Sequence, residues 1–98
     1  MSESTKNKIL DTLSSNLNIY KIDVEDQSYR HAGHVKENSG GHYRVLIVSN
    51  DFMSLSLIDR HKRVYSLLNK LMESEIHALS METLTEEEFS SRSSGAAS

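Results

Sequence analysis

Hydrophobic positions in the first quarter of the chain change from a helical spacing to an alternating one. Apolar side chains recur three or four residues apart up to residue 17, and Ser4 before them suits the N-cap of a helix. From residue 19 to residue 26 the spacing becomes two, which is the period of a half-buried strand. The residues that carry the two patterns are Ile9, Leu10, Leu13 and Leu17, then Tyr20, Ile22 and Val24.

The remaining patterns predict two more strands and two more helices. Residues 27–41 form a long glycine-rich loop, residues 43–49 are apolar on both faces as in a central strand, and residues 50–54 form a turn. Ser56 and Asp59 resemble a capping box that opens a long helix, residues 76–81 form a short strand, and Thr85 with Glu88 caps a last helical turn. The predicted apolar stripe of the long helix consists of Leu57, Ile58, His61, Val64, Tyr65, Leu68, Leu71 and Met72.

This order of elements predicts an α/β (α+β) domain with a three-stranded mixed sheet and helices on one face. The first two strands are expected to be antiparallel neighbours, and the crossover through the long helix makes the second and third strands parallel. His42 and His77, far apart in sequence, should then meet at the sheet edge that also holds the glycine-rich loop. We expect one domain over residues 1–90 and a disordered tail over 91–98, where nothing can be buried.

The composition limits which metal ligands the chain can supply and which kinds of partner it suits. The 98 residues contain no cysteine, so any metal ligand from this chain is a His, Asp, Glu or backbone group. A formal net charge of −3 argues against binding of nucleic acid through the overall charge of the protein, although a local basic patch is compatible with this net charge. No apolar run could span a membrane and no secretory core follows the start, so we expect a cytoplasmic protein.

Several short motifs, taken together and in this order, resemble the BolA family. They cover the chain from about residue 6 to residue 89. They are Val24-Glu-Asp-Gln-Ser28, His31-Ala-Gly-His34, His42-Tyr-Arg-Val-Leu-Ile-Val-Ser49, Phe52, Arg60-His-Lys-Arg-Val-Tyr65 and Ile76-His-Ala-Leu79. The chain departs from the family pattern in lacking the glycine shortly after Phe52, where Met53 and Ser54 stand, and in lacking the proline and tryptophan near the C-terminus.

The resemblance implies a fold similar to class II KH and a role as the partner of a monothiol glutaredoxin. In such complexes a [2Fe–2S] cluster is held by the glutaredoxin cysteine, a glutathione thiol and two groups of the BolA-like chain. The loop position matches His31, with His34 as an alternative, and the position that opens the third strand matches His77. The other interpretation of His77 is a structural histidine bonded to a backbone carbonyl.

Two further groups of residues have a candidate role. Arg60, Lys62, Arg63 and Lys70 form a basic side of the long helix, which suits an acidic partner surface or phosphates, although such a cluster is commonly just solvated. His61 and Tyr65 lie on its apolar stripe, so we expect structural roles, with His61 buried and hydrogen-bonded.

Two functions are therefore considered. The first is an adaptor in iron–sulfur cluster assembly or iron regulation, and the alternative is a nucleic-acid-binding transcriptional regulator. No nucleophile elbow, phosphate loop or zinc-hydrolase motif supports catalysis, so we expect no enzyme. We expect the free chain to be a monomer that carries no cluster, because Fe–S clusters normally need thiolates.

Overall fold

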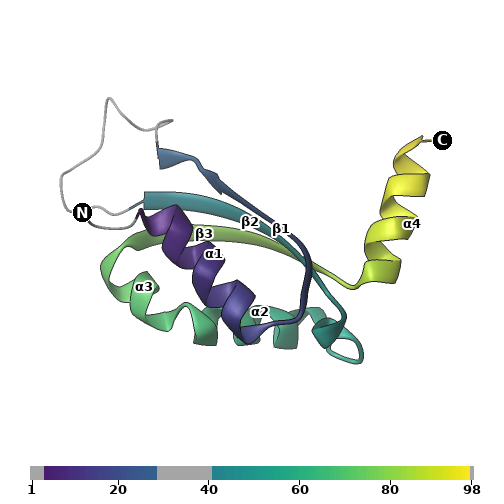
Figure 1. The fold of residues 1–98 in the computed structure, drawn as a ribbon, viewed down its shortest axis with the longest axis horizontal. Helices are drawn as coiled ribbons and strands as arrows, with labels where there is room; N and C mark the ends of the chain where they lie inside the picture. The colour runs from purple at the N-terminus through teal and green to yellow at the C-terminus, as the bar shows by residue number, and fades with distance from the viewer. Residues whose placement is uncertain (1–3, 29–40, 98) are drawn as a thin grey trace.

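The structure, a computed structural model, describes residues 4–28 and 41–97 of the 98. It confirms a mixed α and β architecture built on one three-stranded sheet (Figure 1). Its elements are the helix α1 (Thr5–Asn16), the strands β1 (Ile19–Asp26) and β2 (Gly41–Ser49), the 3-10 turn η2 (Asn50–Phe52), the helices α2 (Leu57–Leu67) and α3 (Asn69–Ser74), the strand β3 (Ile76–Leu84) and the helix α4 (Glu86–Ala97).

The strand order and directions agree with the prediction. The sheet has the order β1-β2-β3, with β1 antiparallel to β2 and β2 parallel to β3. Helices α1, α2 and α3 cover one face, whereas α4 stands at the far end of the sheet, where β3 finishes (Figure 1). The start of β2 and the start of β3 therefore lie at one end of the sheet, and α4 lies at the other.

The core lies between that sheet face and the three helices. Alternate residues of β2 point into it, since Tyr43, Val45 and Ile47 are all buried. They pack with residues of the helices and of the turn that precedes α2, mainly Ile9, Leu13, Phe52, Val64 and Leu68. Tyr20 is an exception to the predicted alternation of β1: it is 60% exposed, because the pairing with β2 shifts register between Ile19 and Lys21.

The predicted long helix is divided in two. Helix α2 stops at Leu67, and Leu68 has φ −96° and ψ 11°, outside the helical range, before α3 begins. Leu68 is fully buried at this junction, and Met72 N donates to its carbonyl oxygen. The hydrophobic period continues through the break, which is why the sequence alone shows one helix.

The buried face of α2 also differs from the predicted stripe. Leu57, Ile58 and Tyr65 are 60%, 67% and 42% exposed. The prediction that Tyr65 belongs to the buried stripe was therefore wrong. The buried residues are Arg60 and Val64. The residues that face the core are thus Arg60, Val64 and Leu68, at a spacing of four. Because one of the three is an arginine, a pattern of hydrophobic residues does not reveal this face.

The C-terminal region is more regular than predicted. Strand β3 continues to Leu84, and α4 continues to Ala97, although we had predicted disorder from residue 91. The predicted capping box explains how the helix starts: Thr85 Oγ1 accepts from Glu88 N at 3.2 Å, and Glu88 Oε1 accepts from Thr85 N at 2.9 Å. Within the described residues, no helix has the length and apolar character needed to cross a membrane.

The turn before α2 holds one strained residue. Ser54 has φ 71°, a left-handed conformation that glycine adopts at little cost and other residues adopt at a cost of about 1–2 kcal/mol. This is the region where the BolA-like pattern has a glycine and this chain has Met53 and Ser54. The departure noted in the sequence therefore corresponds to a real backbone requirement.

Candidate functional site: the histidine corner

Two histidines meet at the end of the sheet opposite α4, as the topology predicted. The ring centroids of His42, on β2, and His77, on β3, are 5.2 Å apart and the ring planes are tilted by 39°. His77 is exposed and His42 is half-buried. The pairing shifts register here, from Gly41 opposite Ile76 to His42 opposite Ala78, so His77 is the residue left out of the ladder. Such an irregularity re-aims a side chain.

Hydrogen bonds fix the backbone of this corner. His42 N donates to Ser28 Oγ at 3.0 Å, and His42 O accepts from Gln27 N at 2.8 Å. Gly41 N donates to Glu75 O at 3.1 Å, which ties the start of β2 to the residue before β3. A Cβ on Gly41 would lie 2.5 Å from the Tyr43 ring and 2.9 Å from Ser28 Oγ, so only glycine fits here.

Glu75 anchors the corner to α1. Its carboxylate accepts from Lys8 Nζ at 2.7 Å and from Thr5 Oγ1 at 2.6 Å. The hydrogen bond from Lys8, and then that from Thr5, lower the pKa of Glu75 below its usual value. These hydrogen bonds link the starts of α1, β2 and β3 at this end of the molecule. The two imidazoles therefore lie on strands whose backbone is held in place.

The other predicted ligands cannot be placed. His31 and His34 lie outside the described residues. Among residues 4–28 and 41–97, no group of three or more His, Cys, Asp or Glu side chains is arranged to hold a metal ion. The described part of the corner therefore offers two imidazoles and no complete coordination shell.

Arg60 has a structural role that its place in a basic cluster does not reveal. It was predicted as a basic contact for a partner, yet it is buried, and its guanidinium is engaged inside the protein. Nη1 and Nη2 donate to the Glu88 carboxylate at 2.7 and 3.1 Å, Nη1 also donates to Thr83 O at 3.0 Å, and Nε donates to Leu55 O at 3.1 Å. The hydrogen bonds from Arg60, and then that from Thr85 N, lower the pKa of Glu88 to about 2.

The rest of the basic cluster remains at the surface. Lys62, Arg63 and Lys70 are exposed, and no ion pair involves them within the described ranges. Lys62 and Arg63 border a groove of about 490 Å³ between the end of α1 and α2, together with Asp59. Three cations, instead of the four predicted, are therefore available to a partner.

His61 is half-buried on α2 and its Nε2 is shielded from solvent. Burial agrees with the structural role that we predicted. However, Nε2 finds no hydrogen-bond partner in the described part of the chain, so the expected hydrogen bond to neighbouring backbone is absent at that atom.

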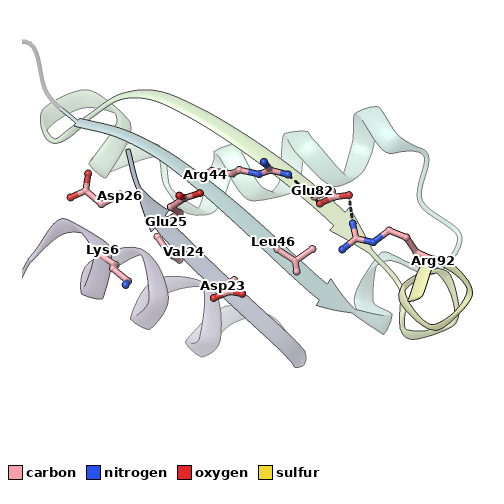
Figure 2. Close-up of a pocket in the computed structure, with 9 residues that line it drawn as sticks. All are labelled: Lys6, Asp23, Val24, Glu25, Asp26, Arg44, Leu46, Glu82 and Arg92. Carbon is pink, nitrogen blue, oxygen red and sulfur yellow. Dashed lines mark hydrogen bonds and ion pairs between the residues drawn. The ribbon is translucent and has the colours of Figure 1, made fainter. Parts of the chain in front are cut away.

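The sheet face that α1, α2 and α3 leave open carries a hollow of about 630 Å³ (Figure 2). Glu82 of β3 lies between Arg44 of β2, at 3.7 Å, and Arg92 of α4, and pairs with both. Asp23 and Glu25 of β1 line the same hollow. None of the predicted site residues lines it. Its main structural effect is to tie α4 to the sheet.

A three-stranded mixed sheet with helices on one face and a histidine pair at one end defines a small α+β domain. The family model for BolA-like proteins matches residues 13–88. The chain therefore belongs to the BolA family.

Individual relatives agree with this assignment. The chain is 33% identical over 94 residues to the chloroplastic protein BOLA1 of Arabidopsis thaliana, covering 92% of this chain and 59% of that protein. It is 38% identical over 66 residues to the DNA-binding transcriptional regulator BolA of Haemophilus influenzae, covering 67% of this chain and 62% of that protein. It thus spans about six-tenths of either relative.

A solved structure also matches. The BolA domain of SufE1 from Arabidopsis thaliana superposes with a TM-score of 0.76 at 38% identity, covering 90% of this chain and 99% of that domain. Almost the whole chain therefore corresponds to one BolA domain.

Proposed function

We propose that this protein is an adaptor that binds a monothiol glutaredoxin and shares a [2Fe–2S] cluster with it. The observation that carries the proposal is an exposed histidine, His77, at a sheet edge that hydrogen bonds hold in place, in a chain of the BolA family. The family resemblance assigns His77 and the loop residue His31, with His34 as its alternative, to the cluster. The partner and its glutathione would supply the thiolates, because the chain has no cysteine.

The donor set fits half of such a cluster site. Fe–S clusters are held mainly by thiolates, and histidines can replace two of them on one iron, which raises the reduction potential. An imidazole must be neutral to bind, so acid is expected to weaken ligation of the shared cluster. This chain's own task is to present neutral imidazoles at a fixed edge of the sheet and leave the remaining positions to the partner.

The test mixes the full chain with a purified, cluster-loaded monothiol glutaredoxin and glutathione. Visible absorption and circular dichroism of the cluster are expected to change when the chain is added. The double variant His31→Ala plus His77→Ala should abolish that change, and His61→Ala, on α2, should preserve it. A spectral change that persists in the double variant would remove the ligand assignment, and no change with the unmodified chain would remove the adaptor function.

A transcriptional regulator that binds nucleic acid is the second candidate, and the name of the Haemophilus relative favours it. Lys62, Arg63 and Lys70 are the exposed cations that could contact phosphates, whereas Arg60 is already paired with Glu88. Three phosphate contacts predict a log–log salt slope of about −2 to −3. Fluorescence anisotropy with duplex DNA measures this slope, and the triple alanine variant should flatten it. Affinity that does not depend on salt would contradict this function.

A further inference from the structure

The two outer edges of the sheet differ in how they are protected against a further strand. Strands β1 and β3 are both edge strands, and within residues 4–28 and 41–97 no other strand pairs with their outer sides. Strand β1 exposes charged side chains along its length, at Lys21, Asp23, Glu25 and Asp26, and such charges discourage pairing. Along β3, by contrast, there is one carboxylate, that of Glu82, and no Lys or Arg. Of the two edges, that of β3 is the more open to another strand.

We propose that β3 pairs antiparallel with β3 of a second copy of this chain, around a twofold axis at Ser80. The two sheets would then form one continuous sheet. Such a contact is isologous and closes on itself, which is the commonest symmetry of soluble oligomers. From the sequence we expected a monomer, and the strand order, which places β3 at an edge, is the observation that changes this expectation.

The backbone of β3 suits this register. Thr83 O accepts from Arg60 Nη1 at 3.0 Å, which places the backbone polar groups of Thr83 on the side away from β2. Because these groups alternate in direction along a strand, those of Leu79 and Met81 point to the free edge as well. A twofold axis at Ser80 places Leu79 opposite Met81 of the second copy, and such a pair can exchange two hydrogen bonds.

The side chains that would meet across this axis are compatible. On the open face of the sheet, Ser80 faces its own copy and Ala78 faces Glu82, so no like charges stand opposite each other. On the face toward the helices, the half-buried side chains of Leu79 and Met81 meet one another. The strand is therefore complementary to itself in both charge and polarity.

Helix α2 adds an apolar surface beside this edge. Helix α1 contacts β1 and α2 contacts β3, so α2 lies under the β3 side of the sheet. Arg63 and Leu67 border the groove between α2 and α1, whereas Ile58 and Tyr65, seven residues apart, lie on the opposite side of α2. Together with Leu57, they are three of the five large hydrophobic side chains that are exposed in the described part of the chain. Apolar side chains that gather at a surface mark contact sites, and a second copy at the β3 edge would cover these three.

Disulfide trapping tests both the contact and its register on the full chain, which has no cysteine of its own. Opposite residues that do not exchange backbone hydrogen bonds have Cα atoms about 4.5 Å apart, a distance that a disulfide spans. Under mild oxidation, Ser80→Cys should therefore form a linked dimer at least about tenfold faster than Ser15→Cys, at an exposed position of α1. Equal rates for the two variants would overturn the proposal.

Sedimentation velocity provides the second measurement. Between about 10 µM and about 1 mM, the dimer fraction of the unmodified chain should rise with concentration, since so narrow a contact gives weak affinity. Ser80→Lys places two ammonium groups on the axis and should weaken association at least about tenfold, and mixing this variant with Ser80→Glu should restore it. A monomer over the whole range, an unchanged dimer in Ser80→Lys, or no recovery in the mixture would overturn the proposal.

The two measurements are protected against trivial failure. Ser80 is exposed, and circular dichroism checks that each variant is folded. If a variant unfolds, the concentration dependence of the unmodified chain still decides whether the dimer forms. Neither measurement involves a glutaredoxin, so failure here leaves the adaptor function standing, and failure of cluster sharing leaves the dimer standing.

Discussion

The two ends of the sheet place their polar residues in opposite ways. At the α4 end, the guanidinium of Arg60 donates hydrogen bonds to two backbone carbonyls and to the Glu88 carboxylate, so its polar groups are bonded within the protein. At the other end, hydrogen bonds fix the backbone around His42 and the carboxylate of Glu75, while the His77 side chain is exposed. At the first end a charged side chain is bonded inside the protein, whereas at the second end the backbone is fixed and a histidine side chain is left exposed.

This difference revises how charged motifs in the sequence are interpreted. Arg60 and Lys62 stand two residues apart in the same basic cluster, yet one is buried and the other is exposed. Burial of a charged side chain is tolerated only when it is paired and hydrogen-bonded. A basic residue at the same helical spacing as Val64 and Leu68 is therefore a structural candidate, and the acidic residue at the capping box is its natural partner.

Removing Arg60 should give the largest loss of stability. Arg60→Ala leaves the carbonyls of Leu55 and Thr83 without this donor and Glu88 without its cation, so the free energy of unfolding should fall by about 3 kcal/mol. Urea unfolding followed by circular dichroism measures this change. Lys62→Ala and Arg63→Ala, on the exposed side of the same helix, should change stability by less than about 0.5 kcal/mol. Equal effects at Arg60 and Lys62 would contradict the comparison.

The second largest loss of stability is expected at low pH, when the Glu88 carboxylate at the α4 end becomes protonated. The pKa of Glu88 is about 2 in the folded protein against an ordinary value of 4.5, so its contribution is complete above pH 4.5 and is lost as the pH falls toward 2. We expect the loss to be smaller than for Arg60→Ala, because the Glu88 side chain is 44% exposed. Urea midpoints between pH 5 and pH 2.5 test this. Glu88→Gln should make the fall shallower, and an identical pH profile in that variant would exclude Glu88 as its cause.

Replacing the strained residue in the turn before α2 should increase the stability of the protein. Ser54→Gly relieves a positive φ just before Leu55, whose carbonyl accepts from Arg60, and should raise stability by about 0.5–1 kcal/mol. The midpoint of thermal unfolding measures the gain. Met53→Gly is the matched control: Met53 is also exposed but has φ −59°, so added flexibility should only destabilise. A loss of stability in both variants would show that the φ of Ser54 costs nothing.

Local patterns predicted most of the fold. The alternation over residues 19–26 matched β1 at both ends, and Ser4, Ser56 and Thr85 accept the predicted capping hydrogen bonds. The topology then brought His42 and His77 together. These features depend on short-range periodicity and on the rule for crossovers, which a single sequence contains.

The features that the sequence missed depend on tertiary contacts. The break at Leu68 interrupts no hydrophobic period, and the exposure of Leu57, Ile58 and Tyr65 depends on how α2 is rotated against the sheet. The pair between Arg60 and Glu88 joins residues 28 positions apart. At the candidate site, the register shift beside His77 likewise exists only once β2 and β3 have paired.

The smallest effect on stability is expected at the histidine corner. His77→Ala removes an exposed side chain from an irregular point of the ladder, so the free energy of unfolding should change by less than about 0.5 kcal/mol. If His77 serves binding, the same variant should nevertheless lose most of the cluster-dependent spectral change with a monothiol glutaredoxin. Urea unfolding and visible circular dichroism on one protein preparation measure both quantities. Arg60→Ala provides the reverse case, since under conditions where it stays folded its His77 is intact. A destabilisation by His77→Ala as large as that by Arg60→Ala would instead make His77 a structural residue, and the two ends of the sheet would no longer differ in kind.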